Sequence, residues 1–371
     1  MREVLFVAGE ASGDLHAAGV AQALARIRPD LKLTAIGGDR LQAAGAEIIE
    51  RYDEMAVMGF VEVLRTIPDH FFLLRRLAAR LQSGRVALLV LVDYPGFNMK
   101  LAEEAAKAGV PVLYYVTPQV WAWGAGRLPK LKRLVKRAAV ILPFEENLLR
   151  GHGIPAEFVG HPLLDRAVNL PSREAARRKL GIRSDEKVLA LFPGSRAQEI
   201  ERHLEDFVET ASRLESQFSG LRVLVSAAST VRIPKEDCPY QLVASDPFTV
   251  LRAADAALCK SGTTTLEAAI CGCPLVVAYR TGAISYMLAR QFVKIPHIAL
   301  VNVVAGREVA REFVQDDLTP RAVAAALTPL LTEGSAERSR MAADLDEVRG
   351  KLGEPGAAER VAGMASEMVI R

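Results

Sequence analysis

Short apolar runs alternate with segments of helical periodicity along most of the chain. The runs cover residues 4–8, 33–36, 86–92, 112–116, 140–142 and 158–159 in the first half, and 188–192, 221–225, 241–243, 256–259 and 275–278 in the second. Runs of this length, separated by helix-length segments, are typical of buried parallel strands with helices on both faces. The pattern therefore predicts an α/β protein with two doubly wound, Rossmann-like parallel sheets.

The chain length and a pause in this pattern indicate where the domains divide. At 371 residues the chain exceeds one ordinary core, so two α/β domains are expected. After residue 159 a polar, proline-containing segment runs to residue 172, and the pattern then starts again. We predict an N-terminal domain over residues 1–166 and a C-terminal domain over 167–345. The final segment, 346–371, is predicted to be helical and to pack back toward the N-terminal domain.

Composition limits the partners and the compartment. Lys and Arg number 47 and Asp and Glu number 44, so the net charge of +3 is too small to indicate nucleic acid as a partner. The four cysteines lack the spacing of a zinc site and are expected to be buried thiols in a reducing compartment. The first apolar run is too short for a signal peptide, and no run has the length of a membrane-spanning helix. We therefore expect a soluble, cytoplasmic protein.

Polar residues that follow the predicted strands are the candidates for chemistry, because ligands of open parallel sheets bind beyond the carboxyl ends of the strands. Glu10, Ser12, Gly13 and Asp14 form a polar turn after the first strand, without the spacing of a dinucleotide or Walker motif. A simple turn with Ser12 as a helix cap is the alternative. Asp93 follows the strand at 86–92 and precedes a rigid Pro-Gly turn, so it is suitably placed to take a proton from a hydroxyl. A turn-capping role is its alternative.

Two turns in the second half are candidate anion sites. They are Gly194-Ser195-Arg196 and Ser261-Gly262-Thr263. Each follows a strand and opens a helix, so backbone N–H groups and the positive end of the helix dipole face whatever binds there. Arg196 is unfavourable at a helix start unless an anion is bound, and Glu267 is suited to accept hydrogen bonds from a sugar. The pairs Ser195 with Gln198 and Thr264 with Glu267 also have capping-box spacing, so a purely structural role is the alternative.

Two segments suggest an amphiphilic partner. Segment 55–81 has more large apolar residues than one helix face requires, and Pro68 is expected to divide it. Segment 127–137 interleaves six cations with leucines and valine, as interfacial helices do beside anionic lipid. Core packing is the alternative for the first segment and a solvated face for the second.

Several motifs, in order along both halves, resemble one family. They are AGEASGD at 8–14, IGG at 36–38, VMGFVEVL at 57–64, DYPGFN at 93–98, PQVWAW at 118–123, VGHPL at 159–163, LFPGSRAQEI at 191–200, KSGTTTLE at 260–267, and Asn302 with GRE at 306–308. The chain resembles the lipid-A-disaccharide synthases, which are inverting glycosyltransferases of the GT-B type with two Rossmann-like domains and an interdomain cleft. It departs from the family where Val301 and Arg311 replace usual prolines, which affects the geometry of the donor loop.

The resemblance implies transfer of 2,3-diacylglucosamine from UDP-2,3-diacylglucosamine to the 6-hydroxyl of 2,3-diacylglucosamine 1-phosphate (lipid X). The products are a β-1,6 disaccharide and UDP, and no metal or other cofactor is expected. The catalytic residues implied are Asp93, as the base, and Arg196, at the leaving group. The implied UDP-sugar residues are Gly194, Ser195, Ser261, Gly262, Thr263, Glu267, Tyr279, Asn302 and Glu308. Those on the acceptor or lipid side are Glu10, Ser12, Gly13, Asp14, Met58, Phe60, Asn98, Gln119 and Trp121.

The resemblance also implies a peripheral location on the cytoplasmic face of the inner membrane, bound to its anionic surface, and it leaves a homodimer open. Two rival functions are considered. One is another GT-B enzyme of UDP-sugars, such as a UDP-N-acetylglucosamine epimerase or a transferase with a soluble acceptor. The other is a non-catalytic nucleotide-binding module that docks on a membrane, which would not need Asp93.

Overall fold

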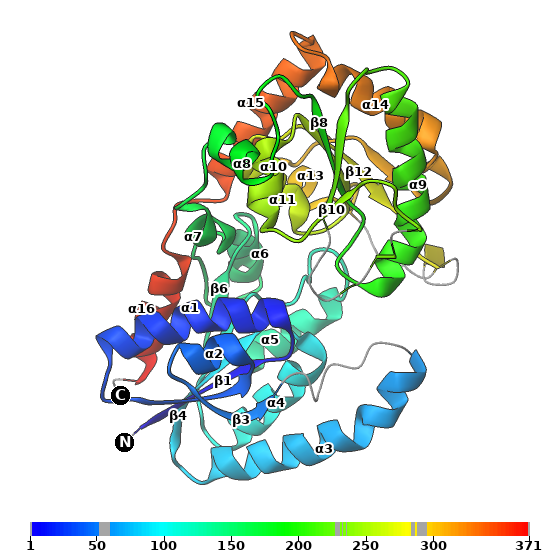
Figure 1. Cartoon of the computed structure of the whole chain (residues 1–371). Coiled ribbons are helices and arrows are strands. Elements are labelled where there is room, and N and C mark those ends of the chain that lie inside the picture. The colour runs from blue at the N-terminus through cyan, green and yellow to red at the C-terminus, as the bar shows by residue number, and fades with distance from the viewer. Residues whose placement is uncertain are drawn as a thin grey trace. The chain divides into compact units, whose positions relative to one another are not determined.

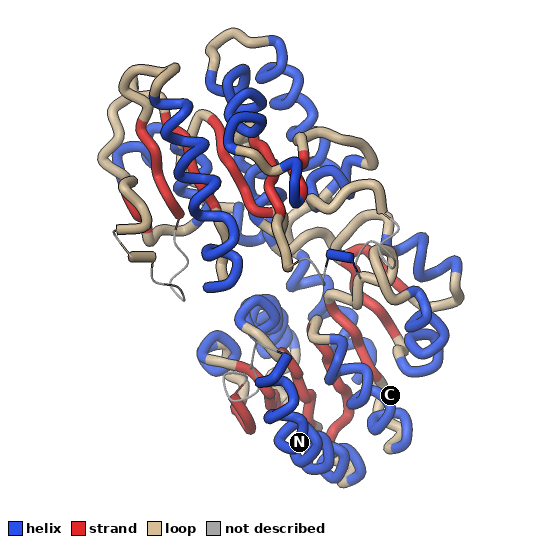
Figure 2. Tube along the Cα trace, turned by 90° about the vertical axis from the view of Figure 1, so that its right-hand side faces the viewer, coloured by secondary structure: helices blue, strands red, loops and turns tan. Residues whose placement is uncertain are grey.

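The computed structural model describes residues 2–51, 60–226, 231, 233–234, 236–282, 286–287 and 295–369. The chain divides into two compact units, the first made of Met1–Asp165 and Gly353–Arg371 and the second of Arg166–Leu352. Each unit holds one parallel sheet between layers of helices, as Figures 1 and 2 show. The two doubly wound sheets predicted from the hydrophobic pattern are therefore present. The predicted cleft between the domains stays a prediction.

The sheet of the first unit has the strand order β3-β2-β1-β4-β5-β6-β7, with every pair parallel. The strands are β1 (Glu3–Ala8), β2 (Lys32–Gly37), β3 (Glu47–Arg51), β4 (Val86–Val92), β5 (Val112–Tyr115), β6 (Arg137–Val140) and β7 (Ala156–Phe158). Alternate side chains of β1 enter two different cores, Leu5 and Val7 on one face and Val4 and Phe6 on the other. Because both faces are buried, the strands read as continuous apolar runs rather than as alternating ones.

The helices of the first unit cover both faces of this sheet. They are α1 (Ala11–Ile27), α2 (Asp39–Ala43), α3 (Phe60–Gln82), α4 (Pro95–Lys107), η2 (Ala125–Arg127), α5 (Leu128–Leu134), α6 (Glu145–Gly151) and α16 (Ala357–Val369), with α7 (Leu163–Ala167) at the boundary between the units. Within α5, Leu128, Leu131 and Leu134 are buried, so the leucines of the basic segment 127–137 belong to the core.

Helix α3 continues through Pro68, so the predicted division of the apolar segment at this residue is wrong. A proline inside a helix removes one backbone hydrogen bond. Three leucines spaced by four residues, Leu73, Leu77 and Leu81, are buried against the sheet and hold the later turns in place. Packing of this apolar face therefore outweighs the local cost of the proline.

The C-terminal helix α16 packs beside α1 in the first unit (Figure 1). Val361, Ala362 and Ala365 enter the core that also holds β1. The carboxylate of Asp165 accepts hydrogen bonds from the backbone N–H groups that start this helix, including that of Ala358 at 3.1 Å. The second unit extends to Leu352 and not to residue 345 as predicted, because the preceding helix stays packed in it.

The sheet of the second unit has the strand order β10-β9-β8-β11-β12-β13, again with parallel pairs. Its strands are β8 (Val188–Phe192), β9 (Arg222–Ser226), β10 (Gln241–Val243), β11 (Ala256–Lys260), β12 (Leu275–Tyr279) and β13 (Glu312–Val314). Its helices are α8 (Arg173–Lys179), α9 (Ala197–Glu215), α10 (Pro247–Ala253), α11 (Thr264–Cys271), α13 (Leu300–Ala305), η3 (Gln315–Asp317), α14 (Pro320–Leu331) and α15 (Ala336–Lys351). In α9 the apolar side chains at helical spacing, such as Phe207 and Leu214, are buried on the sheet.

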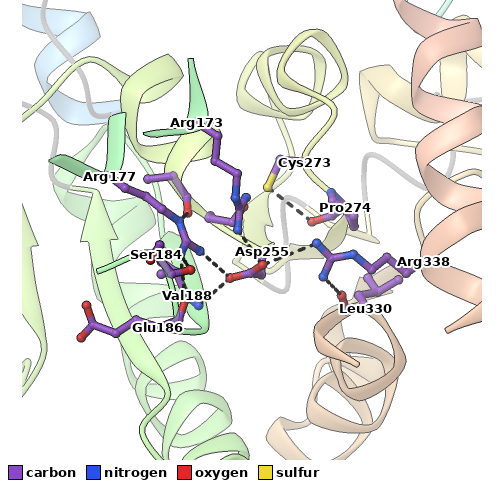
Figure 3. Close-up of polar contacts among 12 residues, drawn as sticks. Arg173, Arg177, Ser184, Glu186, Val188, Asp255, Cys273, Pro274, Leu330 and Arg338 are labelled. Atoms are coloured by element: carbon purple, nitrogen blue, oxygen red, sulfur yellow. Dashed lines mark hydrogen bonds and ion pairs between the residues drawn. The ribbon is translucent and has the colours of Figure 1, made fainter. Parts of the chain in front are cut away.

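One carboxylate, Asp255, fastens helices α8 and α15 to the amino end of this sheet (Figure 3). Its oxygens contact Arg173 at 2.7 Å, Arg177 at 3.0 Å and Arg338 at 3.5 Å. It also accepts a hydrogen bond from the N–H of Val188, the first residue of β8. The same arginines donate to backbone carbonyls, so the cluster is satisfied by partners inside the unit.

All four cysteines are buried and unpaired, as expected for structural thiols. Within the described part of the chain, no helix is both long enough and apolar enough to cross a membrane.

Candidate active site

Both sheets have a point where the strand order reverses, between β1 and β4 in the first unit and between β8 and β11 in the second. Ligands of open α/β sheets bind at such points, beyond the carboxyl ends of the strands. Glu10 and Asp93 follow β1 and β4, while Arg196 and Ser261 follow β8 and β11. The structure therefore places Glu10 and Asp93 at one such edge and Arg196 and Ser261 at the other.

The backbone at Asp93 is held in an unusual conformation. Asp93 and Tyr94 have φ angles of 48° and 46°, in the left-handed region that residues other than glycine rarely adopt. The carbonyl oxygen of Asp93 accepts hydrogen bonds from the Tyr114 hydroxyl and the Asn98 side-chain amide, both at 2.8 Å. These two donors hold the backbone of the turn after β4 in place, so the position from which the Asp93 side chain extends is fixed by its neighbours.

The pKa of the Asp93 carboxyl group is raised toward neutral pH. Burial, and then the negative charge of Glu10, raise the pKa of Asp93 to about 6. A carboxylate with this pKa is a stronger base than an ordinary Asp and is still ionised at neutral pH. The backbone N–H of Tyr94, in the same turn, donates to the Asp93 carboxylate and opposes part of this rise in pKa, so the turn-capping alternative and the role as a base both stay predictions.

The turn after β1 lies close to Tyr94. A methyl group added to Gly9 would come within 2.3 Å of the Tyr94 ring, so this ring packs directly on the backbone of Gly9. Helix α1 begins at Ala11 without a side-chain cap, and the Ser12 hydroxyl donates to the Glu10 carboxylate at 2.6 Å. The alternative role of Ser12 as a helix cap is therefore wrong. Its contact instead orients the Glu10 carboxylate.

Asp14, another predicted acceptor-side residue, is buried and serves the fold. Its carboxylate accepts hydrogen bonds from the backbone N–H groups of Gly38, Arg40 and Leu41, at 2.7, 3.1 and 3.3 Å. It therefore caps α2, 24 residues further along the chain. Gly13 beside it is also buried. Direct contact of these two residues with an acceptor stays a prediction.

The other predicted acceptor-side residues are in different environments. Asn98 is fully buried, and its Oδ1 atom has no hydrogen-bond partner among the described residues. Gln119 is exposed on the loop after β5. Met58 lies outside the described residues, and Phe60 begins α3 with a side chain that also lies outside them.

Trp121 has a buried partner that the sequence motifs did not single out. Its indole N–H donates to the Glu145 carboxyl at 3.0 Å, and the N–H of Leu142 donates to the other oxygen. Burial raises the pKa of Glu145 to about 7. Because Glu145 starts α6 just after β6, it is a second carboxyl group at the carboxyl edge of the first sheet.

The turn after β8 is organised by Glu199, which sequence reasoning missed. The N–H of Ser195 donates to Glu199 Oε2 at 2.9 Å, and Arg196 directly precedes α9 without a side-chain cap, so the alternative of a capping box between Ser195 and Gln198 is not formed. Glu199 Oε1 contacts the Lys260 ammonium at 2.8 Å and the Arg196 guanidinium at 3.5 Å. The exposed Arg196 therefore lies beside a second cation, supplied by the end of β11.

Glu267 is buried in the first turn of α11 and has an ion-pair partner. Arg166 contacts its carboxylate at 3.2 Å and Asp246 at 2.9 Å. Burial raises the pKa of Glu267, and Arg166 opposes that shift. The residue before α11 is Thr263, which makes no side-chain cap, so the alternative of a capping box at Thr264 is not formed.

The remaining predicted donor residues differ in how many hydrogen bonds their side chains make within the protein. The Ser261 hydroxyl donates to the Ile298 carbonyl at 2.9 Å. The Asn302 amide is buried and holds the following loop through hydrogen bonds with Val309, Ala310 and Glu312. Tyr279 ends β12, where its ring lies 6.3 Å from that of His203, and Glu308 is exposed. Contacts of these residues with a donor stay predictions.

Comparison with known proteins decides the family. A sequence model of the family described as "Lipid-A-disaccharide synthetase" matches residues 4–365. Lipid-A-disaccharide synthase of Syntrophus aciditrophicus is 41% identical over 374 residues, covering 99% of this chain and 97% of that protein. The enzyme of the same name from Anaeromyxobacter sp. (strain K) is 43% identical, covering 97% of this chain and 96% of its own. This chain belongs to the lipid-A-disaccharide synthase family.

Solved structures with low sequence identity show the same fold. The S. aureus MnaA–UDP co-structure matches with a TM-score of 0.66 at 13% identity, over 99% of this chain and 96% of that chain. The calicheamicin glycosyltransferase CalG4 matches with a TM-score of 0.64 at 17% identity, over 100% and 98%. The predicted family and GT-B fold are confirmed. The chain is an enzyme, a glycosyltransferase of lipid A biosynthesis.

Proposed function

We propose that this member of the family transfers 2,3-diacylglucosamine from UDP-2,3-diacylglucosamine to the 6-hydroxyl of 2,3-diacylglucosamine 1-phosphate. The new bond joins that oxygen to the anomeric carbon, whose bond to the UDP oxygen breaks, with inversion. The products are the β-1,6 disaccharide 1-phosphate and UDP. The observation that carries the assignment of the base is Asp93, a strand-end carboxyl with a pKa near 6 on a rigidly held turn.

Asp93 takes the proton of the attacking hydroxyl in this proposal. The proton moves to its carboxylate as the oxygen bonds to the anomeric carbon, which carries oxocarbenium character in the transition state. A base with a pKa near 6 is mostly ionised at pH 7 and is basic enough to receive that proton. The hydrogen bonds from Tyr114 and Asn98 to the Asp93 carbonyl hold the backbone from which the carboxylate extends.

The donor occupies the carboxyl edge of the second sheet in this proposal. Arg196 and the turn Ser261-Gly262-Thr263 meet the diphosphate, whose negative charge grows as UDP leaves. Glu267 accepts hydrogen bonds from the ribose, and Arg166 keeps that buried carboxylate oriented. Because cationic and backbone donors take the leaving-group charge, we propose that the reaction needs no metal ion.

We also propose peripheral binding to an anionic membrane on the cytoplasmic face, because both substrates carry acyl chains. Phe71 and Phe72 of α3 are 51% and 65% exposed, and the Arg75 guanidinium lies 4.7 Å from the centre of the Phe71 ring. Exposed aromatic rings beside cations are typical of interfacial helices. Binding to anionic vesicles should weaken with salt and with Phe71→Ser, whereas no binding at low salt would refute the proposal. Analytical ultracentrifugation would show whether the protein forms the homodimer that the family resemblance leaves open.

A direct assay tests the proposed reaction. The protein is incubated with UDP-2,3-diacylglucosamine and 2,3-diacylglucosamine 1-phosphate in the presence of EDTA, and the disaccharide and UDP are measured. Formation of both without added metal is the expected result. Consumption of UDP-N-acetylglucosamine without any acceptor would instead favour an epimerase, such as the UDP-GlcNAc 2-epimerase from Neisseria meningitidis, which has a similar fold. UDP binding without turnover would favour a non-catalytic module.

A further inference from the structure

The ammonium group of Lys260 lies where the two turns of the second unit meet. Lys260 ends β11, which pairs directly with β8, so its side chain starts beside the turn that follows β8. A methyl group added to Gly262 would lie 3.8 Å from its Nζ atom, so the side chain folds back over its own turn. Nζ is also 5.8 Å from the centre of the Tyr279 ring. The ammonium is therefore placed over the turn after β11 and within reach of the turn after β8.

Glu199 keeps the ammonium in this position. It accepts from Lys260 Nζ at 2.8 Å through one oxygen and from the Ser195 N–H at 2.9 Å through the other. A methyl group added to Gly194 would overlap the Glu199 Cβ atom at 2.5 Å, so the carboxylate side chain packs tightly under the turn. Burial opposes ionisation of Glu199, but the hydrogen bonds from Lys260 and the Ser195 N–H, together with the positive charges of Lys260 and Arg196, outweigh burial and lower the pKa of Glu199 below its ordinary value. Glu199 therefore links the two turns as a carboxylate.

Two cations lie beside one carboxylate at the start of α9. Arg196 and Lys260 both contact Glu199, and Lys260 is the nearer of the two. An ammonium has three N–H donors, so Lys260 can keep its contact with Glu199 and still donate to a phosphate oxygen. Charge-assisted hydrogen bonds of this kind are roughly twice as strong as neutral ones.

We propose that Lys260 binds the diphosphate of the donor and that Glu199 is the positioning residue that holds it there. The inference rests on the proposed UDP-sugar donor and adds to it a residue that the sequence motifs did not assign. A cation next to the bond that breaks also stabilises the departing UDP, because the negative charge on the diphosphate grows as the bond to the anomeric carbon lengthens.

A ligand series tests this role without the lipid substrates. Binding of UDP, UMP and uridine is measured by calorimetry for the wild type, Lys260→Met, Lys260→Arg and the control Lys187→Met. Lys187 carries the same charge but precedes β8, at the opposite edge of the same sheet, where it lies over the Phe218 ring. Lys260→Met should weaken UDP binding by about ten- to a hundredfold, UMP binding less, and uridine binding not at all. Lys260→Arg should restore most of the loss, and the control should bind all three ligands like the wild type.

Two outcomes would overturn the proposal. If Lys260→Met binds UDP as the wild type does, Lys260 does not touch the diphosphate. If it loses UDP and uridine equally, or if Lys260→Arg fails to restore UDP binding, the pair with Glu199 only shapes the turns. A wild-type protein that binds none of the three ligands would instead overturn the proposed donor class. The two failures are therefore distinguishable.

Discussion

The carboxyl edges of the two sheets share a topology but differ in their electrostatics. At the edge of the first sheet, burial raises the pKa of Asp93 to about 6 and that of Glu145 to about 7. At the edge of the second sheet, the contact with Lys260 lowers the pKa of Glu199, and two cations lie beside one carboxylate. The first edge is suited to accept a proton, and the second to bind an anion.

The turns at the two points of strand-order reversal also differ in their backbones. After β4, Asp93 and Tyr94 have positive φ angles, although neither is glycine. In the second unit the turn after β8 has a glycine, Gly194, with a φ of 144°. A residue with a Cβ atom is strained at a positive φ angle, so surrounding contacts must hold it there. Such backbone strain is common where a catalytic group must be fixed in place. A phosphate turn needs only close approach of the backbone, which glycine provides.

The largest effect is expected for Asp93→Asn. Removal of a general base lowers turnover by about 10²- to 10⁴-fold, and UDP affinity should stay unchanged because the donor contacts belong to the second unit. Asp30→Asn, at the exposed pair with Arg28, is a matched control that should keep full activity. Steady-state kinetics and UDP calorimetry on both variants check the prediction. Near-normal turnover of Asp93→Asn would remove Asp93 from its role.

Arg196→Ala should lower kcat/KM by about ten- to a hundredfold and leave the pH dependence of the reaction intact. The variant loses the proposed contact between the Arg196 guanidinium and the leaving diphosphate, whose negative charge grows in the transition state. This contact belongs to the second sheet, so the ionisation of Asp93 at the first sheet should be unchanged. Arg202→Ala, six residues further along the chain and within α9, is the matched control. An unchanged rate for Arg196→Ala would contradict the assignment.

Asp255→Ala should destabilise the second unit by about 3 kcal/mol, because the buried Arg177 would lose its partner. Circular dichroism during urea unfolding measures the change. Asp185→Ala removes an exposed partner of Arg183 and should leave the unfolding midpoint unchanged. Equal midpoints for the two variants would show that the cluster in Figure 3 does not fasten α8 and α15.

Stability of the first unit should fall as the pH rises from about 4.5 to about 7. The pKa of Glu145 is raised by folding, so the folded state holds this proton more tightly than the unfolded state, and its contribution is lost as pH passes the folded pKa. Glu145→Gln keeps a neutral side chain and should flatten this dependence. Both tryptophans, Trp121 and Trp123, are in this unit, so their fluorescence during urea unfolding reports on it. An unaltered slope in Glu145→Gln would contradict the prediction.

The fold and the two edges could be predicted from the sequence because they depend on local patterns. Apolar runs marked the strands, and the Gly- and Pro-containing turns after them marked where ligand-binding residues lie. The partners of those residues could not be predicted, because tertiary packing decides them. Asp14 caps a helix 24 residues away, and Glu199 pairs with Lys260, which is 61 residues distant.

The capping-box spacing in the sequence also failed to predict the first residue of helix α9 and the partner of Ser195. Ser195 and Gln198 fit a capping box, but the helix begins at Ala197, which puts the carboxylate of Glu199 within reach of the Ser195 N–H. The signal that could have indicated this pair was the presence of both charged residues in the conspicuous stretches LFPGSRAQEI and KSGTTTLE. Lys260 ends β11, and Glu199 lies in the first turn of the helix that follows the neighbouring strand β8, so their opposite charges become candidates for contact once the strand order is known.

The pH dependence of kcat/KM tests the central claim, that Asp93 at the first edge is the base, most directly. The wild type should gain activity as the pH rises, with an inflection near 6, because the carboxylate must be ionised to accept the proton. Glu10→Gln removes a neighbouring negative charge and should move this inflection to lower pH. The residual activity of Asp93→Asn should lack the inflection. The same inflection in Asp93→Asn as in the wild type would contradict the account.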